Sequence, residues 1–103
     1  MPAGRPMISV AVRCDGNRDD GWTCSVGLRE RGLDVSTHRV HVGPDDLARL
    51  APGASDPTGL VRASFEFLLE REPPQSILRS FDILEIGSYF PEYETEIRRR
   101  TRA

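Results

Sequence analysis

The sequence contains no lysine, no long apolar segment and only two cysteines. Its apolar runs are far shorter than the roughly 20 residues that a membrane-spanning helix requires. The apolar run near the amino terminus ends at Arg13, before it reaches the length of a secretory signal. From these absences we expect a soluble cytoplasmic protein that does not interact with membranes.

Because lysine is absent, arginine supplies all 14 basic residues, against 16 acidic residues and a net charge of −2. This balance lacks the excess positive charge that favours a nucleic-acid partner. The exclusive use of arginine resembles the codon bias of a GC-rich bacterial genome. A run of arginines is therefore weak evidence of function in this chain.

The length of 103 residues, with 38% hydrophobic and 29% charged residues, predicts one domain with its own core. Residues 7–42 show the two-residue period of strands, and residues 44–100 show helical spacing. No repeat or linker separates the two parts. We predict a single α+β domain over residues 1–103, in which a three-stranded antiparallel meander is followed by three or four C-terminal helices packed on one face.

The predicted strands are separated by turn-forming residues at 15–21 and 30–32. The side chains expected to face the core are Ile8, Val10, Val12 and Cys14, then Trp22, Cys24, Val26 and Leu28, then Val40 and Val42. Leu33 and Val35 are out of phase with the end of the third strand. They predict either a β-bulge or a strand with two buried faces.

Proline and capping residues delimit the predicted helices. A short helix begins at Pro44, and the main helix covers residues 57–72 with Asp56 as its N-cap. Asp82 and Glu85 have the spacing of a capping box, and a last helix begins at Pro91.

The main helix has two apolar strips, the wider one formed by Leu60, Val61, Phe65, Leu68 and Leu69. Ala63 and Phe67 form the narrower strip, which a single sheet cannot cover. We expect Phe67 to pack against Phe81, Phe90 and Tyr93 of the same chain, or against a partner.

Two cysteines and two histidines match the number of ligands in a tetrahedral zinc site, namely Cys14, Cys24, His38 and His41. Their spacing disfavours zinc, because the cysteines are far apart and the histidines point to opposite faces of one strand. A disulfide becomes possible if the hairpin is centred near Asp19. We expect reduced cysteines and no metal or other cofactor.

The sequence offers no recognisable catalytic motif, and we predict no catalytic residue. Nucleophile elbows, glycine-rich phosphate loops and His-Glu-x-x-His are all missing. The acidic turn of Asp15, Asp19 and Asp20 lacks the bidentate glutamate of a calcium loop. We consider an enzyme less favoured than a binding protein.

The basic cluster at the carboxyl terminus consists of Arg98, Arg99, Arg100 and Arg102. These arginines are candidate phosphate contacts, although cations at a helix C-terminus also offset the helix dipole. We expect ion pairs from Glu94 to Arg98 and from Glu96 to Arg100. On this interpretation, removing residues 98–103 lowers stability only slightly.

A second candidate surface is aromatic and consists of Phe67, Tyr89, Phe90 and Tyr93. Tyrosines at such positions often span core and surface, which suits a protein interface. We expect Tyr89 or Tyr93 to be partly exposed as an anchor for a partner.

The segments SFEFLLEREP (64–73), SIL (76–78), FD (81–82) and YFPEYE (89–94) resemble short uncharacterised bacterial proteins of actinobacterial type. The resemblance begins at residue 64 and implies no activity, cofactor or site.

Taken together, the residues predict a non-enzymatic binding or accessory module that acts on another protein or on a second copy of itself. The alternative is an antitoxin-like, nucleic-acid-associated regulator that uses the arginine cluster. A small enzyme is the third hypothesis.

Overall fold

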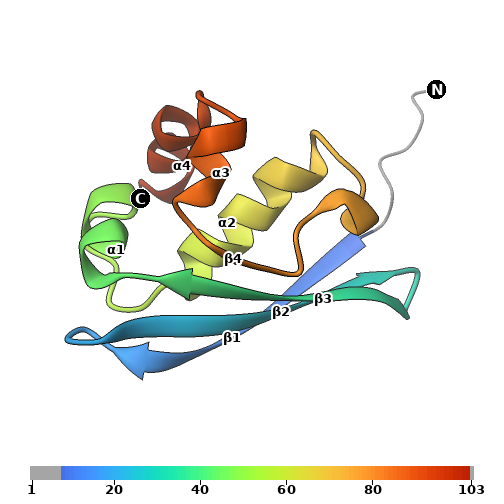
Figure 1. The fold of residues 1–103 in the computed structure, drawn as a ribbon, viewed down its shortest axis with the longest axis horizontal. Coiled ribbons are helices and arrows are strands. Elements are labelled where there is room, and N and C mark those ends of the chain that lie inside the picture. Colours follow the sequence, from blue (N-terminus) through green and yellow to red (C-terminus); the bar gives the residue numbers. More distant parts are fainter. Residues whose placement is uncertain (1–7, 103) are drawn as a thin grey trace.

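Three long strands form an antiparallel meander in the computed structural model, which describes residues 8–102. They are β1 (Ile8–Asn17), β2 (Gly21–Glu30) and β3 (Leu33–Val42). The helices that follow are α1 (Pro44–Leu50), α2 (Thr58–Leu69), η1 (Pro74–Ser76), α3 (Glu85–Tyr89) and α4 (Tyr93–Thr101). Figure 1 shows all of them on one side of the sheet. The predicted α+β class and chain order are confirmed.

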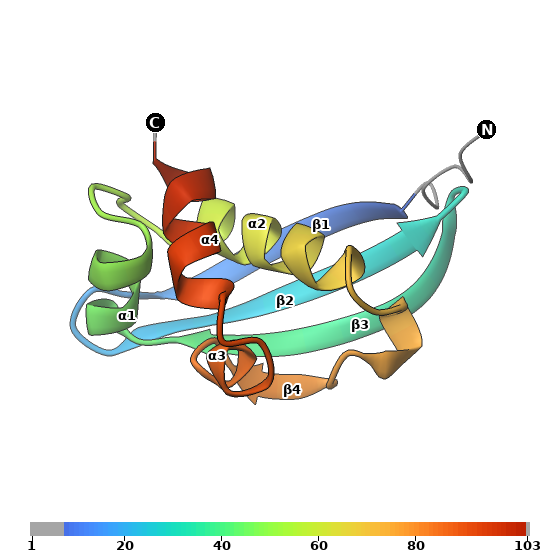
Figure 2. The same cartoon turned by 90° about the horizontal axis from the view of Figure 1, so that it is seen from above.

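The sheet has a fourth strand, β4 (Ser80–Asp82), so the prediction of a three-stranded, wholly antiparallel sheet was wrong. This strand runs parallel to β3 and lies at the edge of the sheet (Figure 2). The backbone N–H of Arg39 donates to the Arg79 carbonyl at 2.7 Å, and that of Ile83 donates to the His41 carbonyl at 2.9 Å. Three residues are too few to show a two-residue period, and a long-range pairing decides their conformation.

The side chains of β2 alternate as predicted, with Trp22, Cys24, Val26 and Leu28 buried toward the helices. The anomaly at the start of β3 is a β-bulge. Leu28 pairs with Ser36, but Arg29 pairs with Asp34, so Val35 has no partner on β2. The bulge turns Val35 and Leu33 toward solvent, with 44% and 71% of their surface exposed. The alternative of a strand with two buried faces was therefore wrong.

The helix boundaries follow the local signals closely. The main helix is shorter than the predicted 57–72, and its N-cap is Pro57, so the assignment of Asp56 as N-cap was wrong. The Asp56 carboxylate still accepts a hydrogen bond from the Thr58 N–H, one residue before the position of an N-cap. Two carboxylates at the start of α3 accept local backbone hydrogen bonds. Glu85 accepts from the Asp82 N–H, and Asp82 accepts from the Leu84 N–H. Half of the predicted capping box forms, because Glu85 reaches back to the Asp82 N–H, but the N-cap of α3 is Leu84 and not Asp82.

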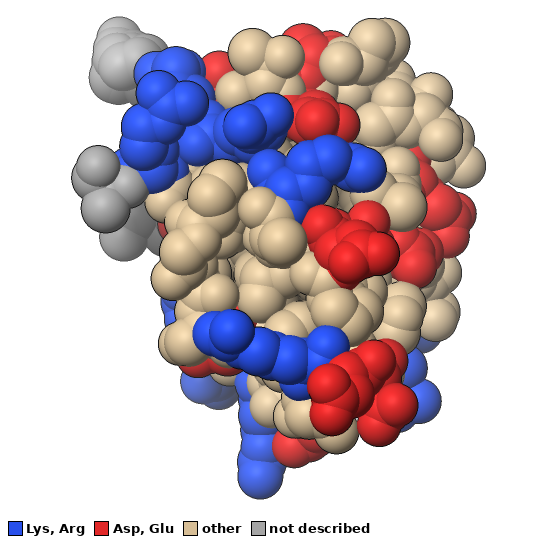
Figure 3. All heavy atoms as spheres, turned by 90° about the vertical axis from the view of Figure 1, so that its left-hand side faces the viewer, with Lys and Arg blue, Asp and Glu red and all other residues tan. Residues whose placement is uncertain are grey.

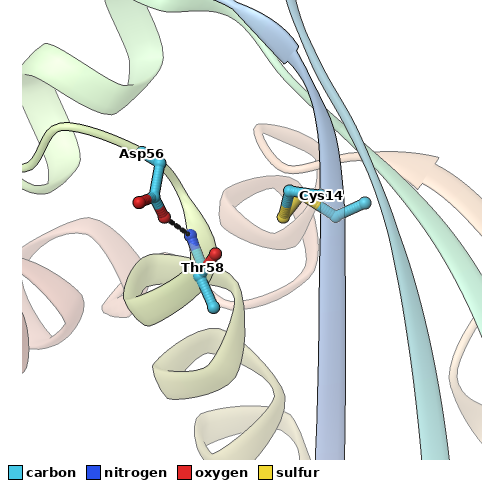
Figure 4. Close-up of a disulfide and its surroundings, with 4 residues drawn as sticks. Cys14, Asp56 and Thr58 are labelled. Atoms are coloured by element: carbon cyan, nitrogen blue, oxygen red, sulfur yellow. Dashed lines mark hydrogen bonds between the residues drawn. A yellow bond between two sulfur atoms is a disulfide. The ribbon is translucent and has the colours of Figure 1, made fainter.

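The two cysteines form a disulfide, which contradicts the expectation of reduced thiols. Cys14 pairs directly with Cys24 in the β1–β2 register, so the hairpin is centred on Asp19. The Asn17 side chain holds that turn by accepting from the N–H groups of Asp19 and Asp20. Figure 4 shows the bridge near the start of α2. The strand register places the two sulfur atoms together, which was the condition stated for a bridge.

The core lies between the sheet and the helices, and α2 passes through its centre. Phe65 is fully buried, with its ring centroid 5.3 Å from that of His38 and 6.0 Å from that of Phe81. Phe67 is also fully buried but faces the other helices, against Phe90 and Tyr93. The packing expected for Phe67 is confirmed for Phe90 and Tyr93, whereas Phe81 packs against Phe65.

We expect Phe65→Ala to lower the free energy of unfolding by about 3–5 kcal/mol, because the missing ring leaves a cavity between sheet and helix. Denaturant titration followed by circular dichroism measures the loss. Phe90→Ala is a suitable comparison, since Phe90 is only partly buried and should cost less. A near-neutral Phe65→Ala would contradict the described core.

We expect the purified protein to have no free thiol under denaturing, non-reducing conditions, and reduction to lower its stability by about 3 kcal/mol. The reason is that the bridge restricts the unfolded chain. Thiol counting and thermal melts with and without reductant test this. The Cys14→Ala/Cys24→Ala variant should melt like the reduced protein and be insensitive to reductant.

Candidate functional site

A surface pocket of about 320 Å³ lies between the end of α2, η1, β4 and α3. Its walls are mainly apolar and come from one stretch of the chain, residues 68–90. The lining residues are Leu68, Glu72, Ser76, Ile77, Leu78, Phe81, Glu85, Ile86, Tyr89 and Phe90. The volume is near the lower end of the range for small-molecule sites and suits one or two apolar side chains.

Local sequence signals explain how the pocket is built. Pro73 and Pro74 end the path of α2 and start η1, which turns the chain back toward the sheet. The β4 strand then places Phe81 in the wall, and the hydrogen bond from the Asp82 N–H to Glu85 ties the end of β4 to the start of α3. Each wall therefore depends on one of the turns that surround β4.

His38 anchors the wall that carries Leu78. Its ring is 4% exposed, and its Nδ1 donates to the Leu78 carbonyl at 2.7 Å. Its Nε2 is 2.8 Å from the Ser36 hydroxyl. Both ring nitrogens thus have protein partners, and His38 holds the segment between η1 and β4 against β3.

The pocket is lined by carboxylates and by no cationic side chain. Glu72 and Glu85 are its charged lining residues, and no histidine or cysteine lines it. Two apolar lining residues are well exposed, Leu78 with 46% of its surface and Tyr89 with 65%. The pocket therefore continues into an exposed apolar rim with negative charge beside it.

The four predicted interface aromatics separate into two groups. Tyr89 and Phe90 line the pocket, and Tyr89 is exposed as expected for an anchor. Phe67 and Tyr93 are buried in the core, so their assignment to an interface surface was wrong. The Tyr93 hydroxyl lies 2.7 Å from that of Ser64, and burial raises the pKa of Tyr93 above its ordinary value of 10.0.

The four candidate phosphate contacts also fall into two groups, those with and those without an ion-pair partner. Arg100 donates to Glu70 at 2.7 Å and to Glu96 at 2.8 Å, and Arg99 donates to Glu96 at 2.7 Å. Within the part of the chain that the structure describes, Arg98 and Arg102 form no ion pair. Figure 3 shows basic and acidic side chains side by side at this end of the molecule.

The predicted ion pairs of the last helix are half correct. The pair between Glu96 and Arg100 forms, whereas Glu94 lies 3.5 Å from Arg49 of α1 and not against Arg98. The Thr101 hydroxyl donates to the Leu50 carbonyl at 2.9 Å. The carboxyl-terminal residues thus hold α4 on α1 and α2, and these contacts disfavour the expectation that removing residues 98–103 lowers stability only slightly.

Two arginines also cover the ring of Phe67. The guanidinium carbon of Arg71 lies 3.6 Å from the ring centroid, and that of Arg100 lies 5.7 Å away. Arg71 also donates to Glu92, at 3.1 Å. These cation–π and ionic contacts join the end of α2 to the segment around α4.

The candidate zinc ligands do not converge. The cysteines are bonded to each other, His38 is buried on the inner face of β3, and His41 is exposed on the outer face. No group of three or more potential metal-ligating side chains occurs within residues 8–102. No helix in that range is long and apolar enough to span a membrane.

Sequence reasoning missed Glu72, Ser76, Ile77, Leu78, Glu85 and Ile86 as lining residues of a site. The available signal was the apolar pair Ile77–Leu78, which follows two prolines after Gln75 and Ser76. Such a pair can belong to the core or to a surface. Indeed Ile77 is 5% exposed and Leu78 is 46% exposed.

None of the protein-family models, curated proteins and solved structures compared with the chain matches it. The functional argument therefore depends on the geometry of the site.

We expect acid to destabilise the protein through the carboxylates that hold α4. Hydrogen bonds from Arg99 and Arg100 lower the pKa of Glu96 from 4.5 to about 2, and a hydrogen bond from Arg100 also lowers the pKa of Glu70. A lowered folded-state pKa stabilises the fold above the unfolded-state pKa, and this contribution is lost as the pH falls. The melting temperature should therefore fall between about pH 4.5 and about pH 2.

Thermal melts of Glu96→Gln across this range provide the test, because the variant should lose part of the pH dependence. Glu66→Gln is the matched control, since Glu66 is exposed on α2 and forms no ion pair with any residue in 8–102. Equal acid sensitivity in Glu96→Gln and the parent protein would show that this carboxylate does not stabilise the fold.

Proposed function

We propose that the protein is a non-enzymatic binding module that captures an apolar side chain of a partner protein in the pocket between α2, η1, β4 and α3. The observation that carries the proposal is the continuity of the apolar pocket with an exposed apolar rim at Leu78 and Tyr89. Exposed apolar surface beside a concave site is typical of protein recognition. The pocket accepts one anchor, and the rim accepts the residues beside it.

The charges of the pocket define the flanking chemistry of the partner. Glu72 and Glu85 lie in its walls with no cation beside them in the lining. Glu85 uses one oxygen to accept from the Asp82 N–H, which leaves its other oxygen for a ligand. A partner segment with an arginine or lysine next to its apolar anchor complements this arrangement.

The lining supports binding rather than catalysis. Ser76 carries the aliphatic hydroxyl of the lining, and no histidine accompanies it there. A serine nucleophile requires a base within hydrogen-bond reach, oriented by a third group. His38 contacts the segment that carries Leu78, but both of its ring nitrogens already form hydrogen bonds, with the Leu78 carbonyl and with the Ser36 hydroxyl.

A peptide library displayed on phage and selected against the immobilised protein tests the proposal. We expect selected peptides to combine an apolar anchor with a nearby basic residue. In fluorescence anisotropy, Leu78→Asp should weaken peptide binding by about tenfold or more, because the new carboxylate would lie beside the apolar anchor of the peptide. Glu72→Gln should weaken the basic peptides specifically.

Leu33→Asp is the matched control, because Leu33 is also exposed but lies at the β2–β3 turn. It should leave the affinity unchanged. Selected peptides whose affinity is equal for the parent protein, Leu78→Asp and Leu33→Asp would place recognition elsewhere. Failure to select any binding peptide would also count against the proposal.

A further inference from the structure

The ten-residue strand β1 forms one edge of the sheet and pairs only with β2 among the described strands. A long edge strand offers unpaired backbone N–H and C=O groups to another strand. The opposite edge is different, because β4 has only three residues and its Asp82 N–H already donates to Glu85. The β1 edge is therefore the one long enough to accept a further strand.

Two observations show which backbone groups of β1 point outward. Cys14 and Cys24 have Cα atoms 4.0 Å apart, the close approach of a non-hydrogen-bonded antiparallel pair. The Val10 carbonyl accepts a hydrogen bond from the Arg62 guanidinium and not from β2. Since the pattern alternates, Val12 and Cys14 also direct their N–H and C=O groups away from β2.

One half of this edge is protected and the other half is open. Arg62 of α2 covers the Val10 carbonyl. Beyond it, no side chain in the range 8–102 forms a hydrogen bond with the backbone of Val12 or Cys14. The open half is the part of β1 nearer the turn to β2.

The apolar face is incomplete along the same open half. Val12 and Cys14 are only half-buried, whereas their partners Val26 and Cys24 on β2 are 1% and 0% exposed. One additional strand would satisfy the backbone groups and cover these side chains together. The open half of β1 thus has both unpaired backbone groups and incompletely covered apolar side chains.

We propose that this neighbour is β1 of a second copy of the chain, antiparallel and centred on Cys14. The charges on the outer face select this register. Arg13 of each copy lies opposite Asp15 of the other, which forms two opposite-charge pairs across the strands. Neither side chain has an ion-pair partner elsewhere in the described part of its own chain.

The neighbouring registers are less favourable. A register centred on Arg13 would place the two Arg13 side chains opposite each other. A register centred on Val12 would form no opposite-charge pair and would displace Arg62 from the Val10 carbonyl. The register centred on Cys14 uses residues 11–17 and leaves Arg62 in place. The same patch of both copies forms the interface, as twofold symmetry requires.

Sedimentation velocity of the full chain over a range of concentrations tests the proposal. We expect a reversible dimer, and Arg13→Asp or Asp15→Arg alone should weaken it by about tenfold or more, because like charges then face each other. The double variant Arg13→Asp/Asp15→Arg should restore association. Arg39→Asp is the control, since Arg39 lies in the same outer row as Arg13 but two strands from the edge.

A backbone variant provides a second, independent measurement. Val12→Pro removes an N–H that points outward, so it should keep the circular dichroism spectrum of the fold but lose association. A chain that remains monomeric at every concentration overturns the proposal. A dimer whose affinity is unchanged by both single charge reversals overturns the register and the interface. Neither experiment uses a residue of the pocket, so the outcome is separate from that of the peptide-binding test.

Discussion

The two-sided burial of α2 is the constraint on which the rest of the structure depends. Phe65 faces the sheet and Phe67 faces the opposite direction, yet both are fully buried. No sheet can cover both sides of one helix, so the chain after α2 must return over its outer side. The segment from η1 to α4 does this. The pocket lies where that return path begins, and its shape follows from covering α2.

The polar contacts in the returning segment position it rather than supply chemistry. His38 joins the loop after η1 to β3, and Ser64 joins α2 to Tyr93. Arg71 and Arg100 lie over the Phe67 ring. Arg71 also forms an ion pair with Glu92 at the start of α4, and Arg100 forms one with Glu70 at the end of α2. Buried hydroxyl and imidazole groups are costly unless they are hydrogen-bonded, and each of these is. The arginines at the carboxyl terminus are thus mainly part of helix packing.

The two proposed surfaces are at separate places in the molecule and have different chemistry. The pocket is apolar and acidic and is formed by η1, β4 and the ends of helices. The β1 edge is a backbone surface with one arginine and one aspartate on its outer face. A second copy joined at β1 would leave the pocket, at the opposite edge near β4, free for a partner in each copy. Two copies would then present two pockets, and a partner with two suitable segments would bind more tightly through avidity.

The sequence by itself determined the elements whose signals are local. Alternation in β1 and β2 identified the buried face, and Asp56, Asp82 and Glu85 form local hydrogen bonds within three residues of helix starts, although the N-caps themselves are Pro57 and Leu84. The phase error at Leu33 and Val35 indicated the bulge. These predictions succeeded because a two-residue period and a capping bond involve only neighbours along the chain.

The tertiary structure alone decided the contacts between residues far apart. β4 exists because Ser80–Asp82 pairs with β3, and the disulfide exists because the β1–β2 register places Cys14 opposite Cys24. Tyr89 precedes Pro91 and Tyr93 follows it, yet Tyr89 is exposed and Tyr93 lies in the core. The pocket is lined by residues 68–90 alone, but its shape depends on the long-range pairing of β4 with β3. Burial and register arise from long-range packing, and the pattern of neighbouring residues does not encode which surfaces will meet.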